Sequence, residues 1–269
     1  MKIGTRGLGL VFALTAMVTG GDLHAQDASF AWSQSMRGGQ LLEVKGIVGE
    51  IRVEMASGDR AEVRAEKQGR SRDFGDVEIR VEEHRDGYTI CAVYHPDEAR
   101  GSGCDVEHGG EGRGRRRSLD VEVEYVVRLP AGVEFHGAMV SGDIMARDLR
   151  SDIRANTVDG DIFVSTTEQA TANTVSGSIE VEMGATDWED LSFRTVSGDI
   201  TLWLPERIAT DVDFSSLSGD IDSDFPVTST KRRTRRFIGA ELEGYIGERG
   251  ERSLSFNTVS GDVRLRRAR

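Results

Sequence analysis

Two cysteines, each followed by a histidine at the same spacing, have the sharpest chemistry in this sequence. Cys91 stands four residues before His95, and Cys104 stands four residues before His108. Two thiolates and two imidazoles could hold a structural zinc ion. In an oxidising compartment the two cysteines would instead form one disulfide, closing a loop of about 14 residues worth roughly 3 kcal/mol. We favour the disulfide and keep the zinc site as the alternative.

A second group with chemical potential is a set of aspartates that follow a recurring glycine. Stacked carboxylates would repel one another, so they must turn into water, accept hydrogen bonds from turn N–H groups, or share a cation such as Ca²⁺. The sequence lacks the Gly-Gly-x-Gly-x-Asp nonapeptide of calcium-binding β-rolls, which favours turn capping. The set is Asp143, Asp161, Asp199, Asp220 and Asp262, with Ser178 in the third copy.

No motif of a common enzyme class is found. There is no Gly-x-Ser-x-Gly elbow, His-Glu-x-x-His helix or phosphate loop. The acidic residues recur with the repeat, whereas an active site would break the pattern once. His84, His95 and His108 fall in or beside the cysteine hairpin and His136 at a repeat entry, and we expect all four at the surface. The sequence therefore predicts no catalytic residue and no cofactor.

The recurring aspartates must be positioned by a short unit that recurs along the second half of the chain, most clearly at residues 195–202. Self-similarity at a period near 20 indicates stacked supersecondary units. Its glycines are Gly142, Gly160, Gly177, Gly198, Gly219 and Gly261, at steps of 18, 17, 21, 21 and 42 residues.

Two apolar columns flank the glycine. Apolar residues at a spacing of two indicate β-strands that bury one face, so each repeat is predicted to be strand, turn, strand, with a bulge or corner where the alternation slips before the glycine. Two residues before the glycine stand Val140, Val158, Val175, Val196, Leu217 and Val259. Two residues after it stand Ile144, Ile162, Ile179, Ile200, Ile221 and Val263.

The predicted fold is all-β, a β-solenoid or stacked β-roll of about 17–21-residue strand-turn-strand repeats with hairpin excursions. One strand pair cannot bury its apolar face alone, but copies about 4.8 Å apart would stack Ile on Ile and Phe on Phe. The turn glycine suits positive φ, where asparagine should be tolerated better than valine. Asn156, Asn173 and Asn257 share a column, either as a hydrogen-bonded ladder or as simple turn residues.

The first half of the chain, residues 40–130, is expected to hold degenerate repeats and the cysteine hairpin. One worn copy is centred on Gly49 and a further partial copy on Gly75. Ser57-Gly58-Asp59 lacks the flanking columns and is interpreted as an ordinary turn. Asp86-Gly87 is typical of a hairpin turn, and residues 119–129 alternate as one strand.

Residues 1–25 are expected to be a signal peptide, with Lys2 and Arg6 before an apolar run too short to anchor the chain across a membrane. Its removal, which also removes Asp22, moves the formal charge from −12 to −13. An acidic exported chain disfavours nucleic acid as a partner. With 38% hydrophobic and 30% charged residues, residues 26–269 are expected to form one elongated domain, of which 131–269 is the regular part.

Two basic segments interrupt the repeats. One contains Arg113, Arg115, Arg116 and Arg117 among glycines. The other lies in an excursion over residues 225–252. It could bind a phosphate-bearing glycan, a lipid headgroup or nucleic acid, although a solvated hairpin arm is favoured because no aromatic residues interleave. Its basic residues are Lys231, Arg232, Arg233, Arg235 and Arg236.

The exported head, the weak early repeat, the stretch Cys91-Ala92-Val93-Tyr94 and the recurring Thr-Val-Ser-Gly-Asp-Ile units resemble the bacterial putative-adhesin family of β-strand repeats, a domain of unknown function. The resemblance covers nearly the whole mature chain. It implies a right-handed β-solenoid-like fold in the cell envelope, and it brings no established catalytic residues.

The sequence therefore predicts a non-enzymatic scaffold or adhesin-like protein, periplasmic or on the cell surface, that binds an unidentified envelope polymer or protein. The alternative is a carbohydrate-active β-helix enzyme, a polysaccharide lyase or hydrolase, which would need carboxylates or a basic residue placed over a groove.

Overall fold

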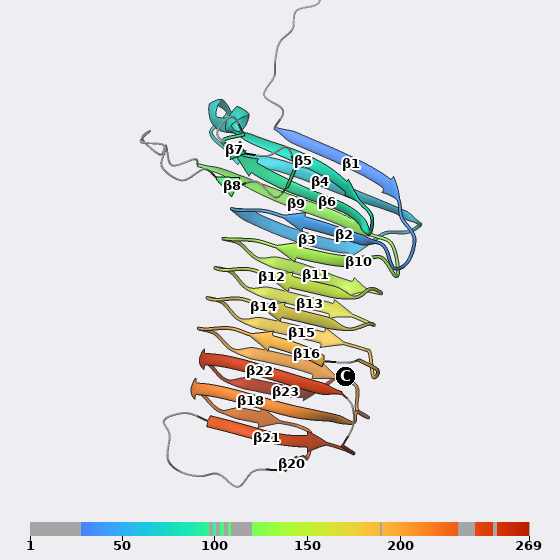
Figure 1. Cartoon of the computed structure of the whole chain (residues 1–269), viewed down its shortest axis with the longest axis vertical. Coiled ribbons are helices and arrows are strands. Elements are labelled where there is room, and N and C mark those ends of the chain that lie inside the picture. Colours follow the sequence, from blue (N-terminus) through green and yellow to red (C-terminus); the bar gives the residue numbers. More distant parts are fainter. Residues whose placement is uncertain are drawn as a thin grey trace, which may run out of the picture.

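The chain forms one stack of β-strands along its longest axis (Figure 1). The computed structural model describes residues 28–96, 99–100, 103–104, 107–108, 120–188, 190–230, 240–249 and 252–268. The signal peptide expected at 1–25 and the basic residues at 113–117 and 231–236 lie outside the described residues. No helix in the described part of the chain has the length and apolar character needed to cross a membrane.

The strands belong to two long sheets, both rich in parallel pairs, which confirms the all-β prediction and agrees with a stacked solenoid. Sheet A has the order β1 (Ser29–Ser35), β4 (Arg60–Gly69), β9 (Val121–Leu129), β3 (Gly49–Met55), β11 (Ile144–Leu149), β13 (Ile162–Thr166), β15 (Ile179–Met183), β17 (Ile200–Leu204), β23 (Val263–Arg267) and β19 (Ile221–Ser223). Sheet B has the order β20 (Val227–Ser229), β21 (Ala240–Ile246), β18 (Thr210–Ser218), β22 (Ser253–Ser260), β16 (Asp190–Arg194), β14 (Ala170–Asn173), β12 (Ile153–Asn156), β10 (Glu134–Ala138), β2 (Leu41–Lys45), β6 (Gly87–Tyr94) and β5 (Val77–His84). A separate pair joins β7 (Ala99–Arg100) to β8 (Glu107–His108), and a 3-10 helix, η1, covers Ser71–Asp76.

In the regular part, each rung of the stack is a strand of sheet B, a turn at the repeated glycine, and the strand of sheet A that follows it. The register keeps every column aligned, so that Ile144 pairs with Ile162, Ile162 with Ile179, and Ile179 with Ile200. On sheet B, the rings of Phe193 and Phe256 stack with their centroids 5.6 Å apart. Side chains from both sheets form one buried apolar cluster, as the aligned columns predict.

The rungs do not all stack in sequence order. The last rung, β22 with β23, lies between the rung of β16 and β17 and the rung of β18 and β19, which are consecutive in sequence (Figure 1). At the other end, β2 and β3 lie between β6 with β9 and β10 with β11. Each interposed rung therefore comes from near one end of the described chain.

Antiparallel strands close both ends of the stack. Strands β1 and β4 add to β9, and β5 adds to β6. Strands β21 and β20 add to β18, so the described parts of the 225–252 excursion extend sheet B. The partial repeat expected around Gly75 is wrong, because Gly75 lies in η1 and β5 after it is antiparallel to β6. The worn copy at Gly49 is a true rung, β2 and β3.

The column two residues before the glycine is not in the interior, contrary to the sequence pattern. Val175, for example, exposes 46% of its surface, while the preceding residue, Thr174, is buried. The inward alternation of the sheet B strand continues to the position three before the glycine, and the chain then turns its corner. The break in the alternation just before the glycine therefore marks the corner of the rung, and the valine lies on the outside of that corner.

Replacing Ile200 with Asp should unfold the stack, whereas Thr201→Asp should change the unfolding free energy by less than about 0.5 kcal/mol. Ile200 is fully buried between Ile179 and Val263, so an unpaired carboxylate there costs several kcal/mol. Thr201 lies on the outward face of the same strand. Chemical denaturation of both variants measures the difference, and equal midpoints would contradict the column assignment.

Candidate functional site

The backbone approaches itself most closely at the glycine corner. The six repeat glycines all have positive φ, between +141° and +158°. A Cβ atom built on Gly198 would lie 2.1 Å from the carbonyl oxygen of Gly177 in the neighbouring rung. The same conflict, at 1.6–2.2 Å, recurs at the other five glycines. Each corner therefore has room for hydrogen only, which is a stronger requirement than a positive φ.

Buried hydroxyl groups tie each corner to the next. Thr157, Thr174 and Thr195 donate from Oγ1 to the carbonyl oxygens of Gly142, Gly160 and Gly177, each at 3.1 Å. Each of these hydroxyls thus bonds to a glycine in the neighbouring rung. The column was missed in the sequence analysis, although threonine recurs three residues before the glycine in four of the six copies.

The aspartate column caps the turns. Asp143 Oδ1 accepts the backbone N–H of Asp161 at 2.8 Å, and Asp161 Oδ1 accepts that of Ser178 at 2.7 Å. Asp199 and Asp262 accept the N–H groups of Asp262 and Asp220 in the same way. Turn capping, expected from the sequence, is what four of these five carboxylates do. In the described residues, no group of three or more His, Cys, Asp or Glu is placed to hold a metal ion.

Ion pairs hold the interposed C-terminal rung on the outer face of sheet A. Arg264 reaches Asp199 Oδ2 at 2.7 Å and Asp262 Oδ2 at 3.1 Å. The backbone N–H of Asp262 and then the Arg264 guanidinium lower the pKa of Asp199. Arg266 likewise pairs with Asp222 and Asp224.

Beside the aspartates runs an exposed aliphatic row, which we call the valine ladder. Each member exposes 45–54% of its surface, and one member stands on each of six successive rungs. Single exposed aliphatic side chains are ordinary, but a continuous apolar row is typical of an interaction surface. In stacking order, the valine ladder consists of Val140, Val158, Val175, Val196, Val259 and Leu217.

A polar groove of about 590 Å³ crosses the outer face of sheet B. It extends over β10, β12, β14 and β16, with the loop before β16 as one wall. We call this the sheet B groove. Its polar and charged lining residues are Glu134, His136, Asp152, Arg154, Gln169, Thr171, Asp187 and Asp190.

The groove combines acceptors with a few donors. Burial and, to a smaller extent, the charge of Arg154 lower the pKa of His136, which favours the neutral imidazole. Gln169 donates to Asp152 Oδ2 at 3.2 Å, and Ser253 donates to Asp190 Oδ1 at 2.6 Å, which orients both carboxylates. His136, expected at the surface, is half-buried in the groove floor.

Trp188 contributes to the wall of the sheet B groove and is 4% exposed. Its indole Nε1 is buried and has no hydrogen-bond partner among the described residues. A buried N–H without an acceptor is costly, so this indole is a strained feature of the groove wall. Sequence reasoning did not single out Trp188, because its role depends on a loop that meets the sheet B face only in the fold.

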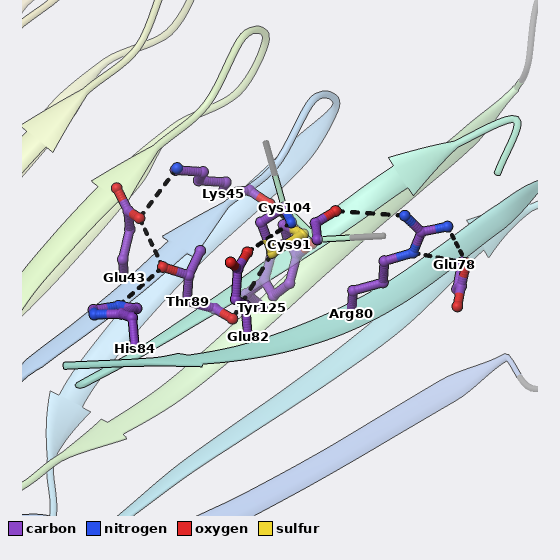
Figure 2. Close-up of a disulfide and its surroundings, with 11 residues drawn as sticks. Glu43, Lys45, Glu78, Arg80, Glu82, His84, Thr89, Cys91, Cys104 and Tyr125 are labelled. Carbon is purple, nitrogen blue, oxygen red and sulfur yellow. Dashed lines mark hydrogen bonds and ion pairs between the residues drawn. A yellow bond between two sulfur atoms is a disulfide. The ribbon is translucent and has the colours of Figure 1, made fainter. Parts of the chain in front are cut away.

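The cysteines lie at the other end of sheet B, where Cys91 of β6 and Cys104 form a disulfide. Figure 2 shows how the short segment at Cys104 is also bound to the β5–β6 hairpin. Glu82 accepts the backbone N–H of Cys104 at 2.9 Å, and Arg80 donates to Gly103 O at 3.4 Å. With both sulfurs in this bond, Cys91 and Cys104 provide no thiolates for the zinc alternative. The side chain of His108 lies outside the described residues.

Around the disulfide, polar side chains pair with one another rather than converge on a site. Thr89 donates to Glu43 at 2.9 Å and lies 3.3 Å from His84 Nε2, while Lys45 pairs with Glu43 at 3.1 Å (Figure 2). His95 lies just after β6 in a positive-φ turn. This region is a structural cap, which leaves the valine ladder and the sheet B groove as the two candidate sites.

Residues 140–266 match the family model described as Toastrack DUF4097. This part of the chain is similar to the Toastrack family. The matched residues include all six glycine corners and the whole valine ladder. None of the curated proteins matches the sequence.

Three solved structures are similar to the chain at low identity. One, described as a putative cell adhesion protein from Clostridium sporogenes, is 8% identical with a TM-score of 0.47, covering 89% of this chain and 100% of that one. A putative adhesin from Bacteroides fragilis is 10% identical with a TM-score of 0.33, covering 88% and 96%. A putative adhesin from Parabacteroides merdae is 7% identical with a TM-score of 0.21, covering 88% and 95%.

Gly198→Ala and Gly198→Asn should both destabilise the domain by more than about 3 kcal/mol, as should Gly198→Val, because any Cβ meets the Gly177 carbonyl oxygen. We therefore no longer expect asparagine to be milder at this corner, since φ is +146°, far from the left-handed helical value near +57°. Gly58→Ala is the matched control: it stands in the same Ser-Gly-Asp tripeptide, but its Cβ would have nothing within 4 Å. Thermal unfolding should leave Gly58→Ala within about 0.5 kcal/mol of wild type. Similar losses at both sites would contradict the contact.

The protein, purified without reductant, should have a mass two hydrogens below that of the reduced chain, with Cys91 and Cys104 in one cross-linked peptide. Reduction should lower the melting temperature, because it frees the closed loop in the unfolded state. Intact-mass and peptide mass spectrometry measure both forms. Free thiols in the protein purified without reductant would contradict the disulfide.

Proposed function

We propose that this protein is a non-enzymatic, adhesin-like binding protein of the cell envelope, which holds an extended, hydroxyl-rich polymer such as a glycan in the sheet B groove. The supporting observation is a polar groove that crosses four rungs and is lined by carboxylates, an amide, a guanidinium and a hydroxyl. Carboxylates and amides accept hydrogen bonds from sugar hydroxyls, while Arg154 and Thr171 donate to ring and linkage oxygens.

The spacing of the rungs suits such a chain. Rungs about 4.8 Å apart are close to the length of one sugar residue in an extended polysaccharide, so equivalent side chains can meet successive residues. Thr171 and Arg154 occupy the same column on neighbouring strands, paired through the register of β12 and β14. The repeated fold thus offers a ligand with its own repeat a matching row of contacts.

The export expected from the sequence agrees with this proposal. The Cys91–Cys104 disulfide is of the kind that persists in oxidising compartments, which supports a periplasmic or cell-surface location.

A carbohydrate-active enzyme is the second candidate, and one observation favours it. Glu134, Asp152, Asp187 and Asp190 place four carboxyl groups around the same groove, and glycosidases act through a pair of carboxyl groups flanking the scissile bond. Three of the four are already engaged: Asp152 with Gln169, Asp190 with Ser253, and Asp187 with Arg252 at 2.8 Å. Measured cleavage of a polysaccharide would distinguish the enzyme from the binding protein.

The test measures binding and cleavage of a uronate polymer and of peptidoglycan by the exported protein. We expect binding without release of reducing ends or unsaturated products. The double variant Arg154→Ala, Thr171→Val removes two groove donors at sites that are not in the core, and it should weaken binding by about tenfold or more. Isothermal titration calorimetry gives the affinity, and far-UV circular dichroism shows that the fold is kept.

Ser255→Ala is the matched control, because Ser255 occupies the same outward column on β22 but lies outside the groove lining. It should bind like wild type. Equal affinity of the double variant and wild type, or no binding to either polymer, would contradict the groove as the binding site. Product release that depends on a groove carboxylate would establish the enzyme instead.

A further inference from the structure

The valine ladder lies at the corner between the two sheets, away from the lining of the sheet B groove, and the glycan proposal leaves it unexplained. Its six members repeat once per rung, so the ladder is about 24 Å long. Nothing in the described part of the chain covers these side chains, which keep about half of their surface in solvent.

The periodicity of the ladder selects among protein partners. Same-face residues of an extended strand recur about every 6.6 Å, whereas an α-helix presents one apolar position per turn of about 5.4 Å. The rungs are about 4.8 Å apart, so over the length of the ladder the contact positions of a strand fall out of register by about 1.4 rungs, and those of a helix by about 0.6 rung. A helix therefore keeps its apolar stripe on the ladder.

The charges beside the ladder define the helix further. Asp143, Asp159 and Asp161 are exposed next to Val140 and Val158. None of these three carboxylates forms an ion pair within the described residues. Towards the other end, Asp199 and Asp262 are already paired with Arg264. Asp220, beside Leu217, is exposed and has no ion pair within the described residues. Most of the unneutralised negative charge therefore lies along the first half of the ladder, where it would attract a cationic partner.

We propose that the valine ladder is the docking site for an amphipathic, cationic α-helix of a partner protein. The apolar stripe of the helix packs on Val140, Val158, Val175 and the members that follow. Its lysines and arginines face Asp143, Asp159 and Asp161. This site goes beyond the proposed glycan binding, on which it does not depend.

The test uses a synthetic helical peptide of about 16 residues, long enough to span the ladder, with leucines on one face and lysines beside them. Fluorescence anisotropy measures its binding to the exported protein at low and physiological salt. We expect saturable binding that weakens as salt rises. The double variant Val158→Thr, Val175→Thr keeps β-branched side chains of equal size at exposed sites, and it should weaken binding about tenfold.

Two matched variants complete the design. Val126→Thr changes an exposed valine of β9 that is 37% exposed and not part of the ladder, and it should bind like wild type. The triple variant Asp143→Asn, Asp159→Asn, Asp161→Asn keeps an oxygen acceptor for each capped N–H, and it should remove most of the salt dependence. A peptide with glutamates in place of the lysines should not bind detectably.

Several results would overturn the proposal. They are no binding by wild type, equal binding by the Val158→Thr, Val175→Thr variant and the Val126→Thr control, or equal binding of the cationic and acidic peptides. A concentration-dependent dimer that the ladder variant abolishes, measured by sedimentation velocity, would identify a second copy of this chain as the occupant and would also overturn it. Glycan binding should be unchanged in the ladder variants, so the two proposals fail separately.

Discussion

The close contact of consecutive backbones at the glycine corner is the constraint on which the other features depend. Parallel strands about 4.8 Å apart leave no room at the turn for a Cβ atom, so glycine stands at the corner of every regular rung. Around it, a threonine hydroxyl on the inside and an aspartate carboxylate on the outside satisfy backbone groups of neighbouring rungs. The Thr-x-Ser-Gly-Asp pattern therefore records one local hydrogen-bonded geometry repeated along the stack.

Much of this arrangement could be predicted from the sequence, because repetition aligns equivalent residues. The isoleucine column after the glycine, the phenylalanines stacked on sheet B, the aspartate caps and the disulfide all follow from residue type and spacing. The exposure of the valine ladder did not, because β-branched residues favour extended backbone whether or not they are buried. At a corner, the alternation of side chains no longer reports which face is inside.

The order of the rungs was beyond sequence reasoning for a different reason. The columns show that Val263 and Ile200 occupy equivalent positions, but every rung offers the same edges, so similarity alone does not select neighbours. Arg264 shows what does, since it pairs with Asp199 across the new interface. The sheet B groove was likewise not predicted, because its wall at Trp188 comes from a loop outside the repeated columns. Gly75 is a false match to the repeat. Alternating apolar residues follow it, but it lies in η1 and belongs to no rung.

The interposed rungs have a consequence for how the chain folds. The hydrogen bond from Asp262 to Asp199 joins residues 63 apart in sequence, and the corresponding rung pairs with strands on both of its sides. Long-range contacts of this kind slow folding, since loop closure must be completed before they form. The same arrangement also affects how the domain unfolds. The edge strands β1, β5, β19 and β20 can still fray, but the interposed rungs are paired on both sides. Extracting β22 and β23 from between their neighbours breaks hydrogen bonds on two sides at once, which makes that route of unfolding slow and gives this part of the domain kinetic stability.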